Sequence, residues 1–122
     1  MVFAKRVFTW AAIFGFVMVA PLLVAESLVA RLLHHTLTQP QWYYAFAEVA
    51  LGFQVLYLMI GRDPVRYRPL MPVCAVCKFA FGATMWTLVG LGRTQPLLGL
   101  AATPDMLWAG AFLVAYRLTP AA

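Results

Sequence analysis

The chain has 122 residues, of which 64% are hydrophobic and 11% are charged, and its formal net charge at pH 7 is +5. Soluble globular domains carry about 25% charged residues, so this balance excludes the water-soluble classes of protein. It does not indicate a nucleic-acid-binding protein either, because the basic residues stand in short segments beside long apolar runs, where they orient a chain in a membrane.

Four apolar runs follow one another, each long enough to span a bilayer. At about 1.5 Å rise per residue, about 20 residues cross the roughly 30 Å hydrocarbon core. Because hydrocarbon offers no partner to backbone N–H and C=O groups, these runs predict helices. We therefore expect one all-α transmembrane domain over residues 1–122, with helices at about 7–33, 42–60, 70–91 and 97–117.

The first run follows Lys5 and Arg6, as in a secretory signal peptide. Its charge-free stretch from Val7 to Ala25 exceeds the about 7–15 apolar residues of such signals, so we expect a retained span. Pro21 lacks a backbone donor and predicts a kink.

Beyond Pro21 the first helix is expected to continue, through Glu26, out of the lipid into the outer interface. His34 and His35 are neighbours about 100° apart on a helix and make a poor chelate. We therefore predict no metal site.

The fourth run contains Thr103-Pro104-Asp105, which also has the pattern of an N-cap followed by a first-turn proline and acid. A helix starting at Pro104 would be about 22 Å long, too short to span. We therefore favour a single helix kinked at Pro104.

The connections are short, which predicts antiparallel neighbours and an up-down bundle. Small residues that allow close helix contact are Ala11, Gly15, Gly52, Gly82, Ala109 and Gly110. Basic residues on one side of the membrane are Lys5, Arg6, Arg62, Arg66, Arg68 and Arg117, with only Arg31 and Arg93 on the other. The positive-inside rule then places both termini in the cytoplasm, and the expected location is a bacterial cytoplasmic membrane.

Three ionisable residues lie within the spans: Glu48, Lys78 and Asp105. A charge at the bilayer centre costs at least about 2.5–3.5 kcal/mol, so such residues face inward and pair. Counting about 1.5 Å per residue, Glu48 lies about 9 Å, Asp105 about 12 Å and the Lys78 backbone about 18–20 Å below the outer surface. Since a lysine stem climbs several ångströms, we expect all three to meet in the outer half of the bundle.

Two neighbours extend this predicted cluster. Tyr44, one turn before Glu48, is expected to donate to its carboxylate, and Gln54 lies near the depth of Lys78 but about 120° around the helix from Glu48. Two acids and one base predict that one acid is protonated or that a cation binds. Two interpretations remain open: an ion-pair network that only fixes helix register, or a polar cavity for a ligand, a proton or a partner helix.

Cys74 and Cys77 form a CxxC, as in small membrane bundles that pass electrons from thiols to quinone. Those enzymes use a second cysteine pair, and this chain has two cysteines in all. The pair also falls on the predicted cytoplasmic side, where thiols stay reduced. The alternative is a structural role as small apolar residues.

The chain resembles a widespread bacterial family of small, uncharacterised four-helix membrane proteins. The resemblance covers most of the chain and is carried by the runs Gln39–Phe46, Ala50–Gln54 and Arg62–Met71, with the Asp-Pro-x-Arg loop at Asp63–Arg66 as the best motif. Members of that family carry a proline followed shortly by an acid in the first helix, as Pro21 and Glu26 do here, and a lysine and an aspartate in the third and fourth helices, matching Lys78 and Asp105. Glu26, with the two cysteines, is a secondary site candidate. Gln39 and Cys77 depart from the family pattern, which expects a histidine and an acid there. A looser similarity links the chain to DoxX-like and sterol-isomerase/sigma-2-receptor-like bundles.

Three functions follow as hypotheses, and the sequence indicates no particular cofactor. The first is an accessory subunit of a larger membrane complex, or a homo-oligomer, or a binder of a small lipophilic ligand. The alternative is a membrane enzyme that acts on a sterol-like, isoprenoid or quinone substrate, with Glu48 or Asp105 exchanging the proton. Transfer of protons or small cations is the third and also requires a water path.

Overall fold

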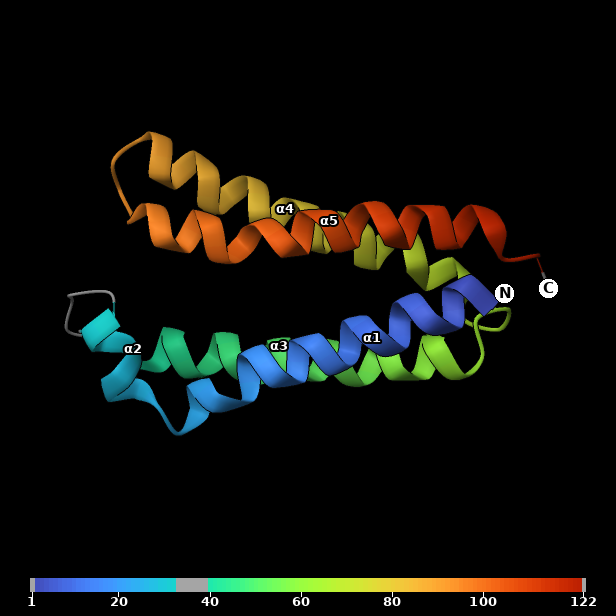
Figure 1. The fold of residues 1–122 in the computed structure, drawn as a ribbon, viewed down its shortest axis with the longest axis horizontal. Helices are drawn as coiled ribbons and strands as arrows, with labels where there is room; N and C mark the ends of the chain where they lie inside the picture. The colour runs from blue at the N-terminus through green and yellow to red at the C-terminus, as the bar shows by residue number, and fades with distance from the viewer. Residues whose placement is uncertain (1, 33–39, 122) are drawn as a thin grey trace.

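The computed structural model describes residues 2–32 and 40–121, and every regular element in these ranges is helical. The elements in chain order are α1 (Val2–Val19), the 3₁₀ turn η1 (Ala20–Leu23), α2 (Glu26–Leu32), α3 (Pro40–Arg62), the 3₁₀ turn η2 (Arg68–Leu70), α4 (Met71–Gly90) and α5 (Pro96–Leu118). Figure 1 shows their arrangement. The predicted all-helical class is confirmed.

Four segments are long and apolar enough to cross a membrane. They are Val2–Leu23, with 22 residues, and Pro40–Arg62, Arg68–Gly90 and Pro96–Leu118, with 23 each. Proline stands at the start of α3 and α5 and in the first turn of α4. A helix loses nothing there, because the first N–H groups have no intrahelical acceptor. The prediction of four helices long and apolar enough to span a membrane is confirmed.

The two internal prolines behave differently. A continuous first helix over 7–33 was wrong: α-helical geometry ends at Val19, η1 contains Pro21, and a break at Val24 and Ala25 precedes α2. Pro21 has no N–H to donate to the carbonyl four residues earlier. The Val24 N–H donates to Pro21 O at 3.1 Å, only three residues earlier, which is the 3₁₀ pattern. By contrast, α5 passes through Pro104 as a single helix, as favoured from its length.

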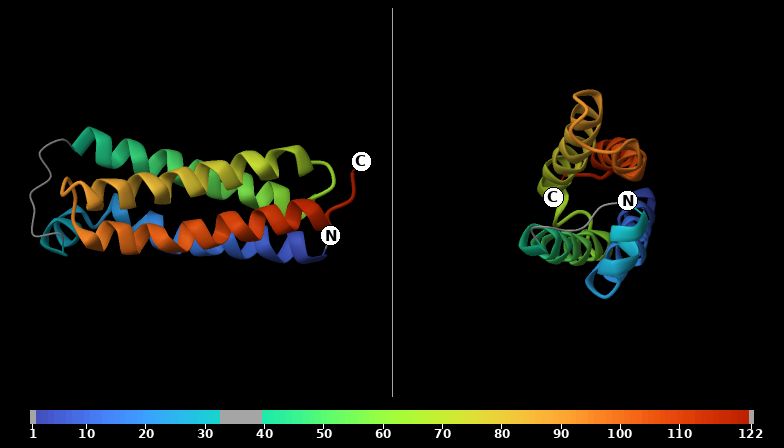
Figure 2. Two further views of the ribbon diagram at one scale, coloured as in Figure 1. Left: turned by 90° about the horizontal axis from the view of Figure 1, so that it is seen from above. Right: turned by 90° about the vertical axis from the view of Figure 1, so that its left-hand side faces the viewer.

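The four long helices form a bundle of two closely packed pairs. Helix α1 packs along α3, α4 packs along α5, and the pairs meet mainly where α1 contacts α5. Figures 1 and 2 show both chain termini at one end of the bundle, hereafter the terminal end, and α2 at the other, the α2 end. The two pairs diverge toward the α2 end.

The hydrophobic core lies in the half of the bundle nearest the terminal end. The Phe8 and Phe112 rings stack with centroids 4.2 Å apart, and the Tyr57 ring lies 5.1 Å from Phe112. The other large side chains buried with them are Ile60 and Met71. In the half nearest the α2 end, the buried residues of α3, α4 and α5 are all small: Ala47, Gly82, Gly99 and Ala102. Apolar packing therefore joins the pairs at the terminal end.

An arginine secures that end of the bundle. Arg68 Nε donates to Tyr116 O at 3.2 Å and to Thr119 O at 2.7 Å, and its guanidinium lies 3.9 Å from the centroid of the Tyr116 ring. The last carbonyls of a helix have no intrahelical donor and carry partial negative charge, so a guanidinium suits them. Arg68 thereby fixes the start of α4 against the end of α5.

Candidate functional site

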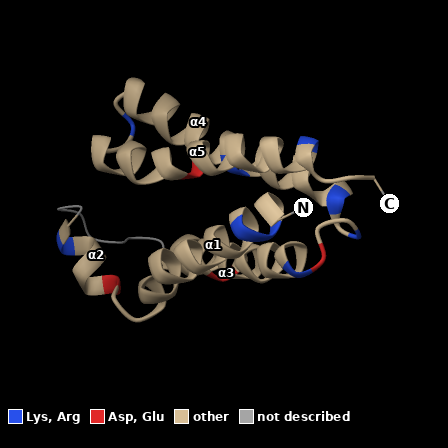
Figure 3. Ribbon diagram, turned by 45° about the vertical axis from the view of Figure 1, so that its right-hand side comes forward, with Lys and Arg blue, Asp and Glu red and all other residues tan. Residues whose placement is uncertain are grey.

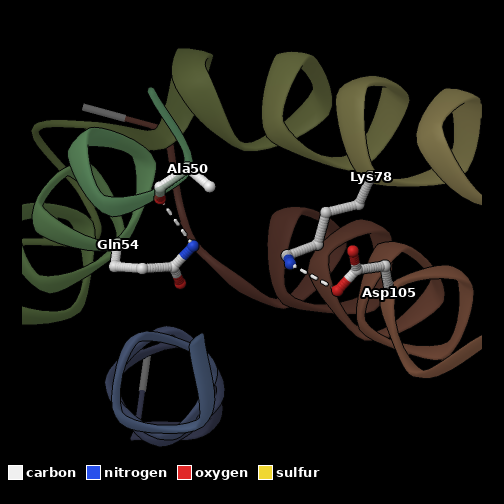
Figure 4. A network of polar contacts seen from close by, with 4 residues as sticks. All are labelled: Ala50, Gln54, Lys78 and Asp105. Atoms are coloured by element: carbon white, nitrogen blue, oxygen red, sulfur yellow. Dashed lines mark hydrogen bonds and ion pairs between the residues drawn. The ribbon is translucent and has the colours of Figure 1, made fainter. Parts of the chain in front are cut away.

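A lysine and an aspartate form an ion pair in the middle of the bundle. Lys78 of α4 and Asp105 of α5 approach to 3.0 Å between Nζ and Oδ1, as Figure 4 shows. At about 1.5 Å per residue, Lys78 lies about 18 Å from the α2 end of α4 and Asp105 about 14 Å from the α2 end of α5. The lysine stem spans this difference in level. The predicted meeting of these two side chains is therefore present.

The ion pair is largely enclosed but remains partly accessible. The fold leaves 9% of the Lys78 side chain and 25% of the Asp105 side chain exposed. Lys78 Nζ also lies 5.2 Å from the centroid of the Tyr57 ring, which is 98% buried in the core. A cation over an aromatic face is attracted by the ring quadrupole, so Lys78 connects the α4–α5 pair to α3.

Gln54 completes what we call the central polar cluster, which consists of Gln54, Tyr57, Lys78 and Asp105. Gln54 is 4% exposed, and its Nε2 donates to Ala50 O at 2.8 Å. Figure 4 shows the Gln54 and Lys78 side chains extending toward one another from α3 and α4. Gln54 Oε1 is buried with no hydrogen-bond partner in the described part of the chain. It rests against α1 at Gly15, where a Cβ would overlap the Gln54 amide.

Glu48 does not belong to the cluster, contrary to expectation. It is exposed on the outer surface of α3 and has no hydrogen bond or ion pair with a residue in the described ranges. The inward face of α3 runs through Ala47, Gln54, Tyr57 and Gly61. Glu48 lies about 120° around the helix from Gln54, so one of them must face outward once the other faces the core. The predicted inward orientation of Glu48 was therefore wrong.

Tyr44 donates to a different acid from the one predicted. Its hydroxyl bonds to Glu26 Oε2 at 2.6 Å rather than to Glu48, and the neighbouring Tyr43 hydroxyl bonds to Leu22 O at 2.5 Å. The break after Pro21 brings η1 and the start of α2 against α3, a turn that sequence spacing did not indicate. Glu26, predicted only as a secondary candidate, thus has a defined role in attaching α2 to α3.

The two cysteines lie in different surroundings. Both are free thiols, and Cys74 is buried in the core whereas Cys77 is exposed on the outer surface of α4. Residues three apart on a helix are about 60° apart around it, which separates the core side from the outer side here. The arrangement fits the structural interpretation of Cys74 better than a redox pair.

Two contributors to the site escaped the sequence analysis. Tyr57 was not among the predicted site residues, yet its ring lies inside the bundle beneath the ammonium of Lys78. Gly15 was identified only as a small packing residue, and it is the position that admits the Gln54 amide. Gly15 lies seven residues after the inward-facing Phe8, and Tyr57 lies three residues after the inward-facing Gln54. This helical spacing was the available signal, but it does not identify which helix lies opposite.

The site residues show no arrangement of metal ligands. In the described ranges, no group of three or more His, Cys, Asp or Glu side chains is placed to hold a metal ion. His34, His35 and Gln39 lie outside the described residues. What the central polar cluster offers is a set of charged and neutral hydrogen-bonding groups inside an apolar bundle.

Comparisons with protein-family models, curated proteins and solved structures give no match for this chain.

Proposed function

We propose that this small integral membrane protein binds a small lipophilic ligand whose polar head contacts the central polar cluster. The observation that supports the proposal is the Lys78–Asp105 ion pair, which lies deep within the spans and keeps a quarter of the Asp105 side chain exposed. A charged pair serving only to hold α4 and α5 together would gain from complete enclosure, because lipid contact with a carboxylate is costly.

The chemistry of the cluster indicates a neutral polar head. Lys78 and Asp105 balance one another, so an extra charge on the ligand would have no partner. Lys78 Nζ has N–H groups beyond the one directed at Asp105 Oδ1, and the second carboxylate oxygen accepts hydrogen bonds. A hydroxyl or carbonyl head group fits these partners, as in an isoprenoid alcohol, a sterol or a quinone.

The surrounding apolar side chains suit the rest of such a molecule. Phe46 of α3 and Phe81 of α4 stack at 5.6 Å between centroids, and Phe14 of α1 and Trp108 of α5 lie 6.1 Å apart. These aromatic contacts cross from one helix pair to the other. Aromatic faces at these positions suit contact with the hydrocarbon part of such a ligand.

The proposed setting is a bacterial cytoplasmic membrane, with an up-down bundle and both termini in the cytoplasm. The charge distribution supports this orientation: Figure 3 shows basic residues gathered at the terminal end and fewer at the α2 end. A C-terminal fusion to a fluorescent protein that folds only in the cytoplasm should fluoresce. A C-terminal fusion to a periplasmic phosphatase should be inactive.

Molecules that co-purify with the protein test the ligand proposal. Wild-type protein extracted in a mild detergent should retain a lipophilic molecule, identified by mass spectrometry, that the Lys78→Met/Asp105→Asn double variant loses. The double variant removes both charges together, so no unpaired charge remains to unfold it. Asp63→Asn is the matched control, because Asp63 is exposed in the segment between α3 and η2. Equal retention by wild type and double variant would refute the proposal.

A second candidate, an accessory subunit of a larger membrane complex, is supported by a separate observation. Glu48 is exposed on a spanning helix, about 12 Å from the start of α3 at Pro40. An acid facing lipid at that level is costly, and a neighbouring subunit would relieve the cost. Monomeric behaviour in mild detergent, with no co-isolated protein, would argue against this function.

The enzymatic alternative has less support. General acid–base catalysis requires a carboxyl group free to exchange its proton with a substrate. The ammonium of Lys78 occupies Asp105, and Glu48 faces away from the bundle. Binding therefore accounts for the geometry with fewer assumptions than catalysis on a sterol-like, isoprenoid or quinone substrate.

A further inference from the structure

A continuous strip of exposed residues runs along the outer surface of α3. Its members recur at alternating steps of three and four residues, and we call them the α3 outer strip: Ala45, Glu48, Gly52, Val55 and Met59. Alternation of three and four keeps residues on one side of a helix, so these five form one continuous surface of α3.

Glu48 makes this strip different from an ordinary lipid-facing surface. The other four members are apolar or small, whereas Glu48 carries an acid about 12 Å along the span from Pro40. Glutamate has a short stem and cannot carry its carboxylate that far to the membrane surface as a lysine would. The acid therefore requires a partner at its own level.

A basic residue on another helix is the partner that complements the charge. This chain has nine basic residues, and Lys78 is the one in the middle of a span, where Asp105 already holds it. A second copy related by a twofold axis along the membrane normal would place its Glu48 against the Glu48 of the first copy. The two carboxylates would repel one another, so a second copy does not provide the cation that Glu48 requires.

Gly52 adds a steric reason for a helix as the occupant. It lies one turn from Glu48 on the same strip, and a Cβ built there meets nothing within 4 Å. The bare backbone at this position allows another helix to approach closely, as small residues do at helix contacts in membranes. Close approach brings a basic side chain within reach of the carboxylate.

We propose that the α3 outer strip docks a membrane-spanning helix of another protein that carries a lysine or arginine at the level of Glu48. The inference rests on the accessory-subunit function and names the chemistry of the partner. The docked helix pairs its cation with Glu48 and packs its backbone over Gly52.

Association with defined helices in lipid vesicles tests the proposal. The probes are a polyleucine spanning peptide with one lysine about 12 Å from its outer end, the same peptide with leucine only, and one with the lysine near its inner end. The full chain carries a fluorescent donor and each peptide an acceptor, so energy transfer measures their association. The peptide with its lysine at the level of Glu48 should associate about tenfold more tightly than the leucine peptide. Glu48→Gln should remove the preference and Asp63→Asn should retain it.

Gly52→Leu provides an independent variant, because it blocks close approach and leaves the carboxyl in place. It should also weaken the lysine peptide's association. Equal association of the lysine and leucine peptides, or an unchanged preference in Glu48→Gln, would overturn the proposal. So would self-association of the chain without peptide that depends on Glu48, since that would identify a second copy as the occupant. If the peptides fail while a native protein still co-isolates with the chain, the subunit function survives and only the basic partner is refuted.

Discussion

The two halves of the bundle are held together by different means. At the terminal end, aromatic and aliphatic side chains from all four long helices form one core around Phe8 and Phe112. Toward the α2 end the two pairs diverge (Figure 1), and Phe46 of α3 still stacks on Phe81 of α4 across them at 5.6 Å between ring centroids. Trp86 packs on Gly99 and donates to Thr103 Oγ1 at 3.0 Å within the α4–α5 pair. The central polar cluster lies at the boundary between these halves.

This difference explains why charged groups are tolerated in the middle of the bundle. In lipid no hydrophobic driving force holds helices together, so association depends on close packing and on polar contacts. The terminal half supplies the packing and fixes the separation of the pairs. The cluster lies at the edge of the hydrophobic core, with Lys78 against the buried Tyr57 and Asp105 partly exposed.

The largest expected effect comes from leaving one charge of the ion pair alone. Lys78→Met should destabilise the protein by about 3 kcal/mol, because Asp105 would remain largely enclosed without its cation. The Lys78→Met/Asp105→Asn double variant should recover most of that loss. Unfolding in mixed micelles with increasing SDS measures both. Equal destabilisation by the single and double variants would mean that the charges are not coupled.

The packed half should respond almost as strongly to a cavity. Phe112→Ala should cost about 3 kcal/mol, since Phe112 contacts Phe8, Tyr57 and Trp108 at the centre of the core. Leu113→Ala is the matched control, because Leu113 is exposed on the same helix. The same SDS titration applies. A comparable loss in both variants would place the core elsewhere.

Gly15 tests the level at which the two halves meet. Gly15→Ala should destabilise the protein by about 1–3 kcal/mol, because the new Cβ would overlap the Gln54 amide and force that side chain to move. Gly110→Ala is the matched control, since its Cβ would meet nothing within 4 Å. If both glycine variants unfold at the wild-type SDS fraction, Gln54 adapts without cost and the Gly15 contact is not needed.

The helical class and the four spans follow from length and hydropathy, which is why sequence reasoning obtained them. The Lys78–Asp105 contact also followed, because depth in a bilayer can be counted along each helix and two opposite charges at similar depth attract. The rotation of α3 did not follow. Glu48 and Gln54 are both polar, so a polar-inward rule cannot choose between them. The inward position of Gln54 goes with Gly15 of α1, whose missing side chain leaves room for the Gln54 amide.

The same limit applies to Pro21 and Pro104. Each lies within an apolar run and removes one backbone donor, yet one ends a helix and the other does not. Helix α5, which contains Pro104, packs closely against α4. After Pro21, by contrast, the chain accepts hydrogen bonds from the Tyr43 and Tyr44 hydroxyls of α3. Tertiary contacts, rather than the prolines themselves, decide the outcome.

The smallest expected effect concerns the attachment of α2 to α3. Tyr44→Phe should remove the hydrogen bond to Glu26 and cost about 0.6 kcal/mol, the average for polar contacts between membrane helices. Because that bond joins only the α2 end, amide hydrogen exchange should accelerate in Glu26–Leu32 and stay unchanged in the terminal half. Glu26→Gln should accelerate exchange in the same segment, and the Tyr44→Phe/Glu26→Gln double variant should add little further. Exchange that rises equally around Phe8 and Phe112 would mean that the two halves unfold together, and the distinction between them would then describe packing without describing stability.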